Sequence, residues 1–201
     1  MKLLCFSDLH RDQKAATSLV ERSCDVDCLI GAGDFANRHE GIRDTLDILS
    51  AVDKPAVLVP GNGETFEALT DAAKTWKSAV VLHGTGCTLD GVEFWGVGGA
   101  IPVTPFGSWS YDFDEQQGAD LLDGCPSGAV LVVHSPPLDT VDTDSTGRIR
   151  GSHSVRQTVT EKQPSVVICG HIHDDWGKHV ELGPSRIFNA GPKGVIVECP
   201  G

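Results

Sequence analysis

The sequence has no long apolar run and comparatively few basic residues, and each shortage excludes a class of protein. No stretch of its 201 residues approaches the ~20 consecutive apolar residues of a membrane-spanning helix. The apolar start ends at Ser7, which is too early for a secretory signal sequence. Lys and Arg number 16 against 28 Asp and Glu, giving a formal net charge of −12. Extended nucleic-acid binding needs clustered basic side chains and is therefore not expected.

An even set of cysteines is lacking as well. The sequence has seven cysteines, and Cys5, Cys28 and Cys169 lie inside apolar runs, which is typical of reduced, buried thiols. Cys24 and Cys28 have the spacing of half a zinc site, but no second pair is spaced to complete it. We therefore expect reduced thiols and a cytoplasmic protein.

Strand and helix patterns alternate through the first half of the chain. Apolar runs typical of buried strands cover residues 2–6, 26–30 and 56–59. Helical spacing of apolar residues covers residues 13–22, 41–51 and 64–77. This alternation predicts an α/β domain whose first strands are parallel. Since repeats, linkers and low-complexity tracts are missing, we expect a single domain over residues 1–201.

The second half of the chain has a different pattern. Asp90-Gly91 predicts a hairpin with a type I′ turn. Residues 101–112 form a long loop rich in proline, glycine and aromatics, which we expect to pack beside a functional site. The later elements are a helix at residues 152–161 and strands near residues 129–133, 165–169, 186–189 and 194–198. We expect these strands to be antiparallel and sequential, in a four-layer α/β/β/α sandwich of two mixed sheets.

Side chains that can bind a metal follow five of the apolar strand runs. They are Asp8 and His10, Asp34, Asn62, His134, and His171 and His173. Ligands at the carboxyl ends of strands in one sheet can converge on one edge. Oxygen and imidazole donors without cysteine suit hard or borderline divalent cations such as Mn, Fe or Zn. The arrangement predicts a two-metal centre for phosphoryl chemistry.

Taken singly, these positions have ordinary structural explanations. Asp34 could be a helix cap or a turn residue, and Asn62 could be a turn residue. His134 could be a structural histidine at a strand end, with its ring nitrogens hydrogen-bonded. The spacing of Asp8 and His10 puts both side chains on the same side of an extended chain, so that they can share an ion. The order of all five groups together is what favours a metal centre.

The order Asp-x-His, Gly-Asp, Gly-Asn, His and Gly-His-x-His resembles the calcineurin-like metallophosphoesterases, and the match spans residues 8–173. The resemblance implies two divalent metal ions, with manganese expected first and Fe, Zn, Ni or Co as alternatives. It also implies a set of ligand roles: Asp8, His10 and His173 for the first ion, Asn62, His134 and His171 for the second, and Asp34 as the bridge. A hydroxide shared by the two ions would attack phosphorus, which makes Asp34 and Asn62 catalytic residues.

Two further features concern the substrate. The segment from Gly33 to Arg38 resembles a family stretch whose arginine binds phosphate, so Arg38 is a predicted phosphate ligand. We expect the neighbouring His39 to bind substrate as well. The alternative is a surface arginine at the end of a loop. Gly63 stands where the family commonly has a histidine that protonates the leaving oxygen, and Asn37 replaces the acidic partner of that histidine. The proton-donating pair is therefore absent as a unit, and losing a general acid typically costs ~10²–10⁴-fold in rate.

Three consequences of that loss remain open. The enzyme could prefer substrates with good leaving groups, such as aryl or nucleotide diesters. Another group, His39 or His153, could serve as the acid. Or turnover could be slow, and nucleotide binding the main task. We expect a phosphodiesterase acting on a small phosphate ester or nucleotide. The alternatives are a phosphomonoesterase on protein or small-molecule substrates, and a nucleotide-binding module with weak residual activity. Phe106 and Trp109 either stack on a substrate ring or, as we favour, pack the loop onto the body.

Overall fold

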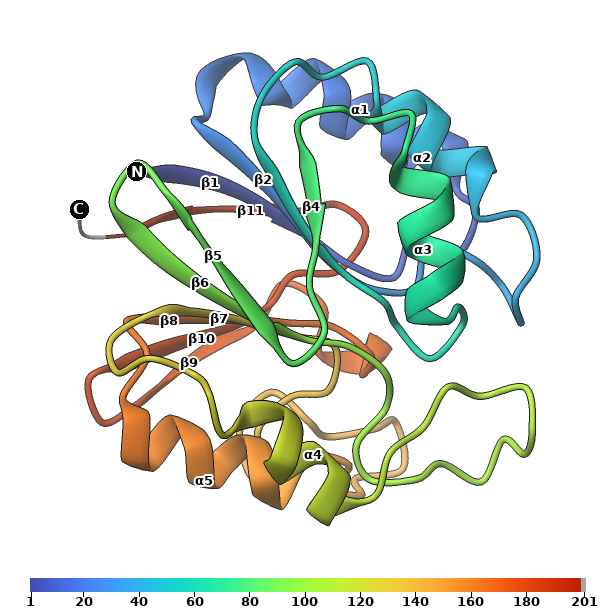
Figure 1. Ribbon diagram of the computed structural model, residues 1–201. Helices are drawn as coiled ribbons and strands as arrows, with labels where there is room; N and C mark the ends of the chain where they lie inside the picture. The colour runs from blue at the N-terminus through green and yellow to red at the C-terminus, as the bar shows by residue number, and fades with distance from the viewer. Residues whose placement is uncertain (200–201) are drawn as a thin grey trace.

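Two sheets pack face to face between two layers of helices in the computed structural model, which describes residues 1–199 (Figure 1). The first sheet consists of β1 (Lys2–Phe6), β2 (Cys28–Ala32), β3 (Ala56–Val59), β4 (Ala79–Val81) and β11 (Val195–Glu198). The second consists of β5 (Thr85–Leu89), β6 (Val92–Val97), β7 (Val130–Val133), β8 (Val166–Cys169), β9 (His179–Leu182) and β10 (Ser185–Asn189). Their strand orders are β11-β1-β2-β3-β4 and β5-β6-β7-β8-β10-β9.

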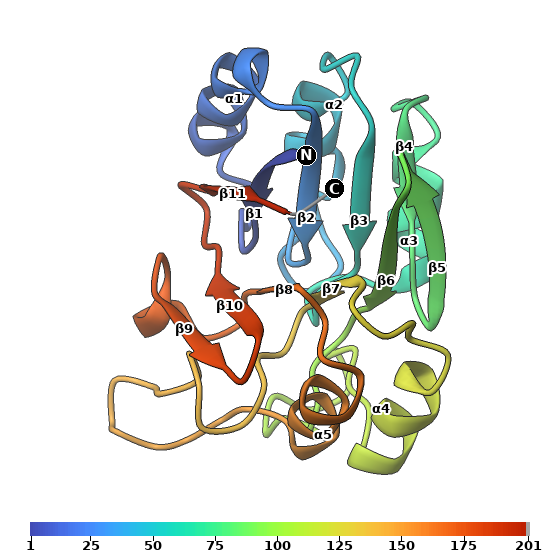
Figure 2. The same cartoon turned by 90° about the vertical axis from the view of Figure 1, so that its left-hand side faces the viewer.

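Helices cover the outer face of each sheet (Figure 2). Above the first sheet lie α1 (Gln13–Arg22), α2 (Arg43–Leu49) and α3 (Phe66–Ala73), and below the second lie α4 (Glu115–Leu122) and α5 (His153–Lys162). Two short 3₁₀ turns, η1 (Ser23–Asp25) and η2 (His173–Asp175), follow α1 and β8. The predicted four-layer α/β/β/α sandwich of two mixed sheets is confirmed.

The central strands are apolar throughout because both of their faces are covered. In β2, Leu29 belongs to the cluster under α1 to α3, while its neighbour Ile30 packs against Val132 and Ile168 of the second sheet. Parallel strands enclosed in this way appear as continuous apolar runs rather than as alternating patterns. This is why the first three strand runs could be found in the sequence.

The pairing of the later strands was predicted wrongly. In the second sheet β6, β7, β8 and β10 are parallel to one another, and antiparallel pairing between the described strands is confined to β5 with β6, β9 with β10, and β11 with β1. A parallel pair needs a crossover connection, which α4 and α5 supply. The prediction missed α4, although Asp114 and Gln117 form a capping box at its start. The half-exposed strands β4 and β9 were missed as well.

The type I′ turn predicted at Asp90-Gly91 is confirmed. Asp90 and Gly91, between β5 and β6, have φ of 48° and 81°, as a type I′ turn requires. The side chain of Ser152 caps α5 by accepting a hydrogen bond from the Val155 amide. All seven cysteines are free, and Cys5 and two other cysteines in the apolar strands are buried. None of the helices in residues 1–199 is both long and apolar enough to cross a membrane.

Candidate metal centre

The seven predicted metal ligands lie together where the carboxyl ends of five parallel strands meet. They come from the loops after β1 (Asp8, His10), β2 (Asp34), β3 (Asn62), β7 (His134) and β8 (His171, His173). The first three loops belong to one sheet and the last two to the other. The group is therefore assembled across the interface between the sheets.

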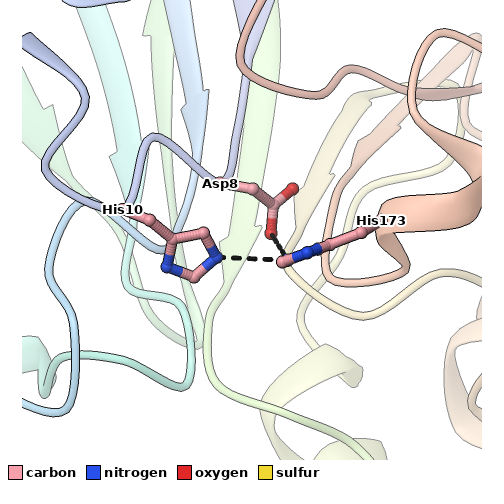
Figure 3. A group of neighbouring side chains, drawn as sticks. All are labelled: Asp8, His10 and His173. Atoms are coloured by element: carbon pink, nitrogen blue, oxygen red, sulfur yellow. Dashed lines mark hydrogen bonds and ion pairs between the residues drawn. The ribbon is translucent and has the colours of Figure 1, made fainter.

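Asp8, His10 and His173 form one part of the group (Figure 3). The Nε2 atoms of the two histidines lie 3.1 Å apart, and His173 Nε2 lies 3.8 Å from an Asp8 carboxylate oxygen. Three donor atoms within 4.8 Å of one another can share one cation. Two facing imidazole nitrogens would otherwise need a proton between them.

Asp34 lies between this part and the rest of the group. One of its carboxylate oxygens is 3.5 Å from His10 Nε2, and the other is 3.6 Å from His134 Nε2. His134 Nε2 also lies 3.2 Å from the side-chain oxygen of Asn62, and its ring centroid is 5.0 Å from that of His171. The Asp34 carboxylate can therefore face two cations at once.

The backbone contacts of His134 and His10 leave their Nε2 atoms, which face the other ligands, available to a metal. His134 Nδ1 lies 2.8 Å from the carbonyl oxygen of Ala32, and His10 Nδ1 lies 3.4 Å from that of Ala36. A carbonyl oxygen can only accept, so the network assigns the proton to Nδ1 and the lone pair to Nε2. Backbone carbonyls orient metal-binding histidines in this way. Together with carboxylate and amide oxygens, these imidazoles fit divalent cations such as Mn, Fe or Zn.

The electrostatics of the group favour cations. Burial alone would raise the pKa of the Asp34 carboxyl, but His134 and His10 hold it below its usual value. Burial and the neighbouring His134 lower the pKa of His171 to about 3, so this imidazole is neutral. Burial works against the protonated form of His134, yet the Asp34 and Asp8 carboxylates raise its pKa. A cation at His134 therefore competes with a proton, and metal binding is expected to release it.

The backbone of the ligand loops is strained. Asp8, His10, Asp34 and His171 have φ of 54°, 45°, 59° and 66°, in the left-handed region that non-glycine residues rarely adopt. Such strain concentrates at functional sites, where the surrounding structure holds it in place. Gly170, just before His171, lies directly against the Asp8 carboxylate, so that a side chain there would collide with it.

Glu64 is a site residue that the sequence reading missed. The helix predicted at residues 64–77 would put it in a first helical turn, but α3 begins at Phe66, and the Glu64 side chain is fully buried. It accepts hydrogen bonds from the backbone amides of Gly61 at 2.7 Å and of Asp34 and Ala36 at 2.9 Å. Burial, and after it the Asp34 charge, raises the pKa of Glu64 to about 7. Glu64 thus joins the loops that carry Asp34 and Asn62.

A cavity of about 1060 Å³ opens over the ligands. Its lining includes His10, Asp34, Asn62, His171 and His173, together with Arg38 and His153. The lining also includes apolar residues of the loop after β6, namely Pro102, Val103, Pro105, Phe106 and Trp109, and of a later segment, Leu138 and Ile149. The donor atoms therefore border a space whose lining is largely apolar.

Arg38 and His39 both contact the loop that carries Trp109. The Arg38 guanidinium carbon lies 5.1 Å from the centre of the Trp109 ring, in cation–π geometry. His39 Nε2 forms a hydrogen bond with the backbone carbonyl of Trp109. Phe106 and Trp109 stack with centroids 5.5 Å apart, and both line the cavity. Arg38 thus lines the cavity, whereas the His39 ring is hydrogen-bonded to the loop.

A protein family matches almost the whole length of the chain. The calcineurin-like phosphoesterase superfamily domain matches residues 1–195 of the sequence. The chain belongs to this superfamily. Its members are dimetal phosphoesterases, and the donor set described above fits two divalent ions.

Individual proteins resemble this superfamily member to different degrees. A UPF0046 protein of Caenorhabditis elegans is 29% identical over 210 residues, which cover 94% of this chain and 69% of the relative. The crystal structure of TT1561 of Thermus thermophilus has a TM-score of 0.75 and 21% identity, covering 96% of this chain and 90% of the other. An archaeal phosphodiesterase has a TM-score of 0.54 and 14% identity, covering 95% and 84%. At these identities the two structures support the fold alone.

Gly63 occupies a position that has little space for a side chain. Its amide donates to an Asp34 carboxylate oxygen at 2.7 Å, and its carbonyl accepts from the His39 amide at 2.7 Å. A Cβ atom there would lie 2.9 Å from the carbonyl oxygen of Ala36, closer than side chains normally approach. A histidine cannot be added at this position unless the loop carrying Asp34 shifts.

Gly63→Ala is therefore expected to lower metal content and stability together, by about 1–3 kcal/mol in unfolding free energy. Gly91→Ala is the control. Gly91 has a positive φ and nothing near its missing Cβ, so that variant should lose stability but keep its metal. Urea unfolding and elemental analysis of both variants measure the difference. Full metal content in Gly63→Ala would show that the loop can adapt.

Proposed function

We propose that the chain is a dinuclear metal-dependent phosphodiesterase, with manganese as the first metal to test. The observation that supports this most is the large, apolar-sided cavity above the convergent donor atoms. A phosphomonoester presents one organic group, whereas a diester presents two, and apolar lining from two separate segments of the chain can accept both. Binding groups away from the reacting phosphorus lets the enzyme orient the ester.

We assign the following roles to the residues. Asp8, His10 and His173 would hold one ion, Asn62, His134 and His171 would hold the other, and Asp34 would be a ligand of both. The bound ions would activate water and neutralise the charge of the phosphoryl group. Arg38, at the cavity, binds phosphoryl oxygens with its guanidinium fork. We also keep His39, next to Arg38 in the sequence, as a predicted substrate-binding residue.

The leaving group is the point at which this chain is expected to be unusual. Gly63 offers no proton, and His39 is hydrogen-bonded to the Trp109 carbonyl. His153 lines the cavity and is the remaining candidate for a general acid. We therefore propose substrates whose leaving oxygen needs little protonation, such as aryl or nucleotide diesters. The seven free cysteines support a reducing cytoplasm as the place of action.

A pair of model esters tests the proposal. With Mn²⁺, kcat/KM for bis-p-nitrophenyl phosphate is expected to exceed that for p-nitrophenyl phosphate by about tenfold or more, equivalent to about 1.4 kcal/mol. Preference for the monoester would support a phosphatase instead. If protein that holds two ions hydrolyses neither ester, both the phosphodiesterase and the phosphatase are contradicted. The remaining function is then a nucleotide-binding module.

A further inference from the structure

We propose that Ser110, backed by Asp112, is a positioning residue that fixes the orientation of the Asn62 side-chain amide and so sets the affinity for the ion at Asn62. The Asn62 amide nitrogen lies 3.0 Å from Ser110 Oγ. Ser110 Oγ lies 2.5 Å from one carboxylate oxygen of Asp112. The other Asp112 oxygen accepts from the backbone amide and the hydroxyl of Thr104, both at 2.7 Å. The inference rests on the metal ligands assigned in the proposed function.

The direction of these hydrogen bonds is determined by Asp112. An ionised carboxylate can only accept, so the single proton of the Ser110 hydroxyl points to Asp112. The hydroxyl then presents only lone pairs to Asn62. Those lone pairs attract the NH₂ end of the amide and repel its oxygen. The amide oxygen of Asn62 must therefore point the other way, where it lies 3.2 Å from His134 Nε2.

This direction matters for metal binding. The two ends of an asparagine amide have nearly the same shape, but only the oxygen binds a cation. A flipped amide would present its NH₂ group to the ion and lose one ligand. Asn62 is 3% exposed, and the Ser110 hydroxyl is the hydrogen-bond partner of its amide nitrogen. Ser110 thus selects the metal-binding orientation of the amide.

The same loop also holds the backbone of Asn62. The Tyr111 amide donates to the Asn62 carbonyl at 3.0 Å, next to the Ser110 contact. Phe106 and Trp109, on the cavity wall, belong to this loop. The loop that borders the substrate space therefore orients a metal ligand directly. Removing a residue that is hydrogen-bonded to a metal ligand typically changes metal affinity by ~10–100-fold.

Titration of metal-free protein with Mn²⁺ tests the role of Ser110. In isothermal titration calorimetry, Ser110→Ala is expected to weaken one of two Mn²⁺ sites by about tenfold or more and to leave the other unchanged. Ser110→Thr keeps the hydroxyl and is expected to retain both affinities. Ser108→Ala, at an exposed serine of the same loop, is the matched control and should bind as the natural protein does.

A thermal measurement separates positioning from folding. In EDTA, Ser110→Ala is expected to unfold at a temperature close to that of the natural protein, while the rise in Tm on adding Mn²⁺ is smaller, since stabilisation follows metal affinity. Unchanged affinity at both sites in Ser110→Ala would overturn the inference, as would a natural protein that binds only one ion. If the natural protein binds two ions but hydrolyses no ester, the proposed function fails while the role of Ser110 is still decided by the titration.

Discussion

Asp34→Asn is expected to abolish phosphoester hydrolysis and to reduce the amount of metal that copurifies with the protein. The Asp34 carboxylate lies between His10 and His134, with one oxygen toward each. Asparagine has the same shape and keeps an oxygen for the Gly63 amide, but it removes one negative charge and one metal-binding oxygen. We expect kcat/KM to fall by about a thousandfold or more, equivalent to about 4 kcal/mol.

The measurement combines steady-state kinetics on bis-p-nitrophenyl phosphate with elemental analysis of the purified variant. Cys24→Ala is the control, because Cys24 is exposed and does not line the cavity. That variant should match the natural protein in both measurements. If Asp34→Asn kept its activity and two ions, the bridging role of Asp34 would be removed.

The convergence of the ligands could be predicted because of strand direction. Asp8, Asp34 and Asn62 each follow an apolar run, and the runs indicated parallel strands, whose carboxyl ends share an edge. The second half of the sequence contains the same signal. His134 and His171 both follow strand ends, and antiparallel neighbours β7 and β8 would have put them at opposite edges. The ligand pattern therefore already favoured the parallel pairing that the structure has.

Contacts between distant backbone segments could not be predicted in this way. The three amides bound by Glu64 include Asp34 and Ala36, 30 and 28 residues earlier in the sequence. Asn62 and Ser110 are 48 residues apart. Neither contact leaves a periodic or compositional signal, since each depends on how two loops meet in space. An acid directly after a glycine-rich turn shows where a loop lies, not which amides surround it.

Glu64→Ala is expected to destabilise the protein strongly. Both Glu64 oxygens are used, and their removal leaves the amides of Gly61, Asp34 and Ala36 buried without an acceptor. An unsatisfied buried donor costs ~1–3 kcal/mol, so the free energy of unfolding should fall by about 3 kcal/mol or more. Urea unfolding of metal-free protein measures this directly.

Two further variants test whether the lost hydrogen bonds of Glu64 cause the destabilisation. Glu67→Ala, on the exposed side of α3, also removes a glutamate side chain and should change stability by about 0.5 kcal/mol or less. Glu64→Gln keeps one acceptor oxygen but turns an NH₂ group toward a backbone amide, so it should fall between the natural protein and Glu64→Ala. Because Glu64 joins the loops that carry Asp34 and Asn62, Glu64→Gln should also bind Mn²⁺ more weakly. Equal unfolding midpoints for Glu64→Ala and Glu67→Ala would show that this carboxylate does not hold the two loops together.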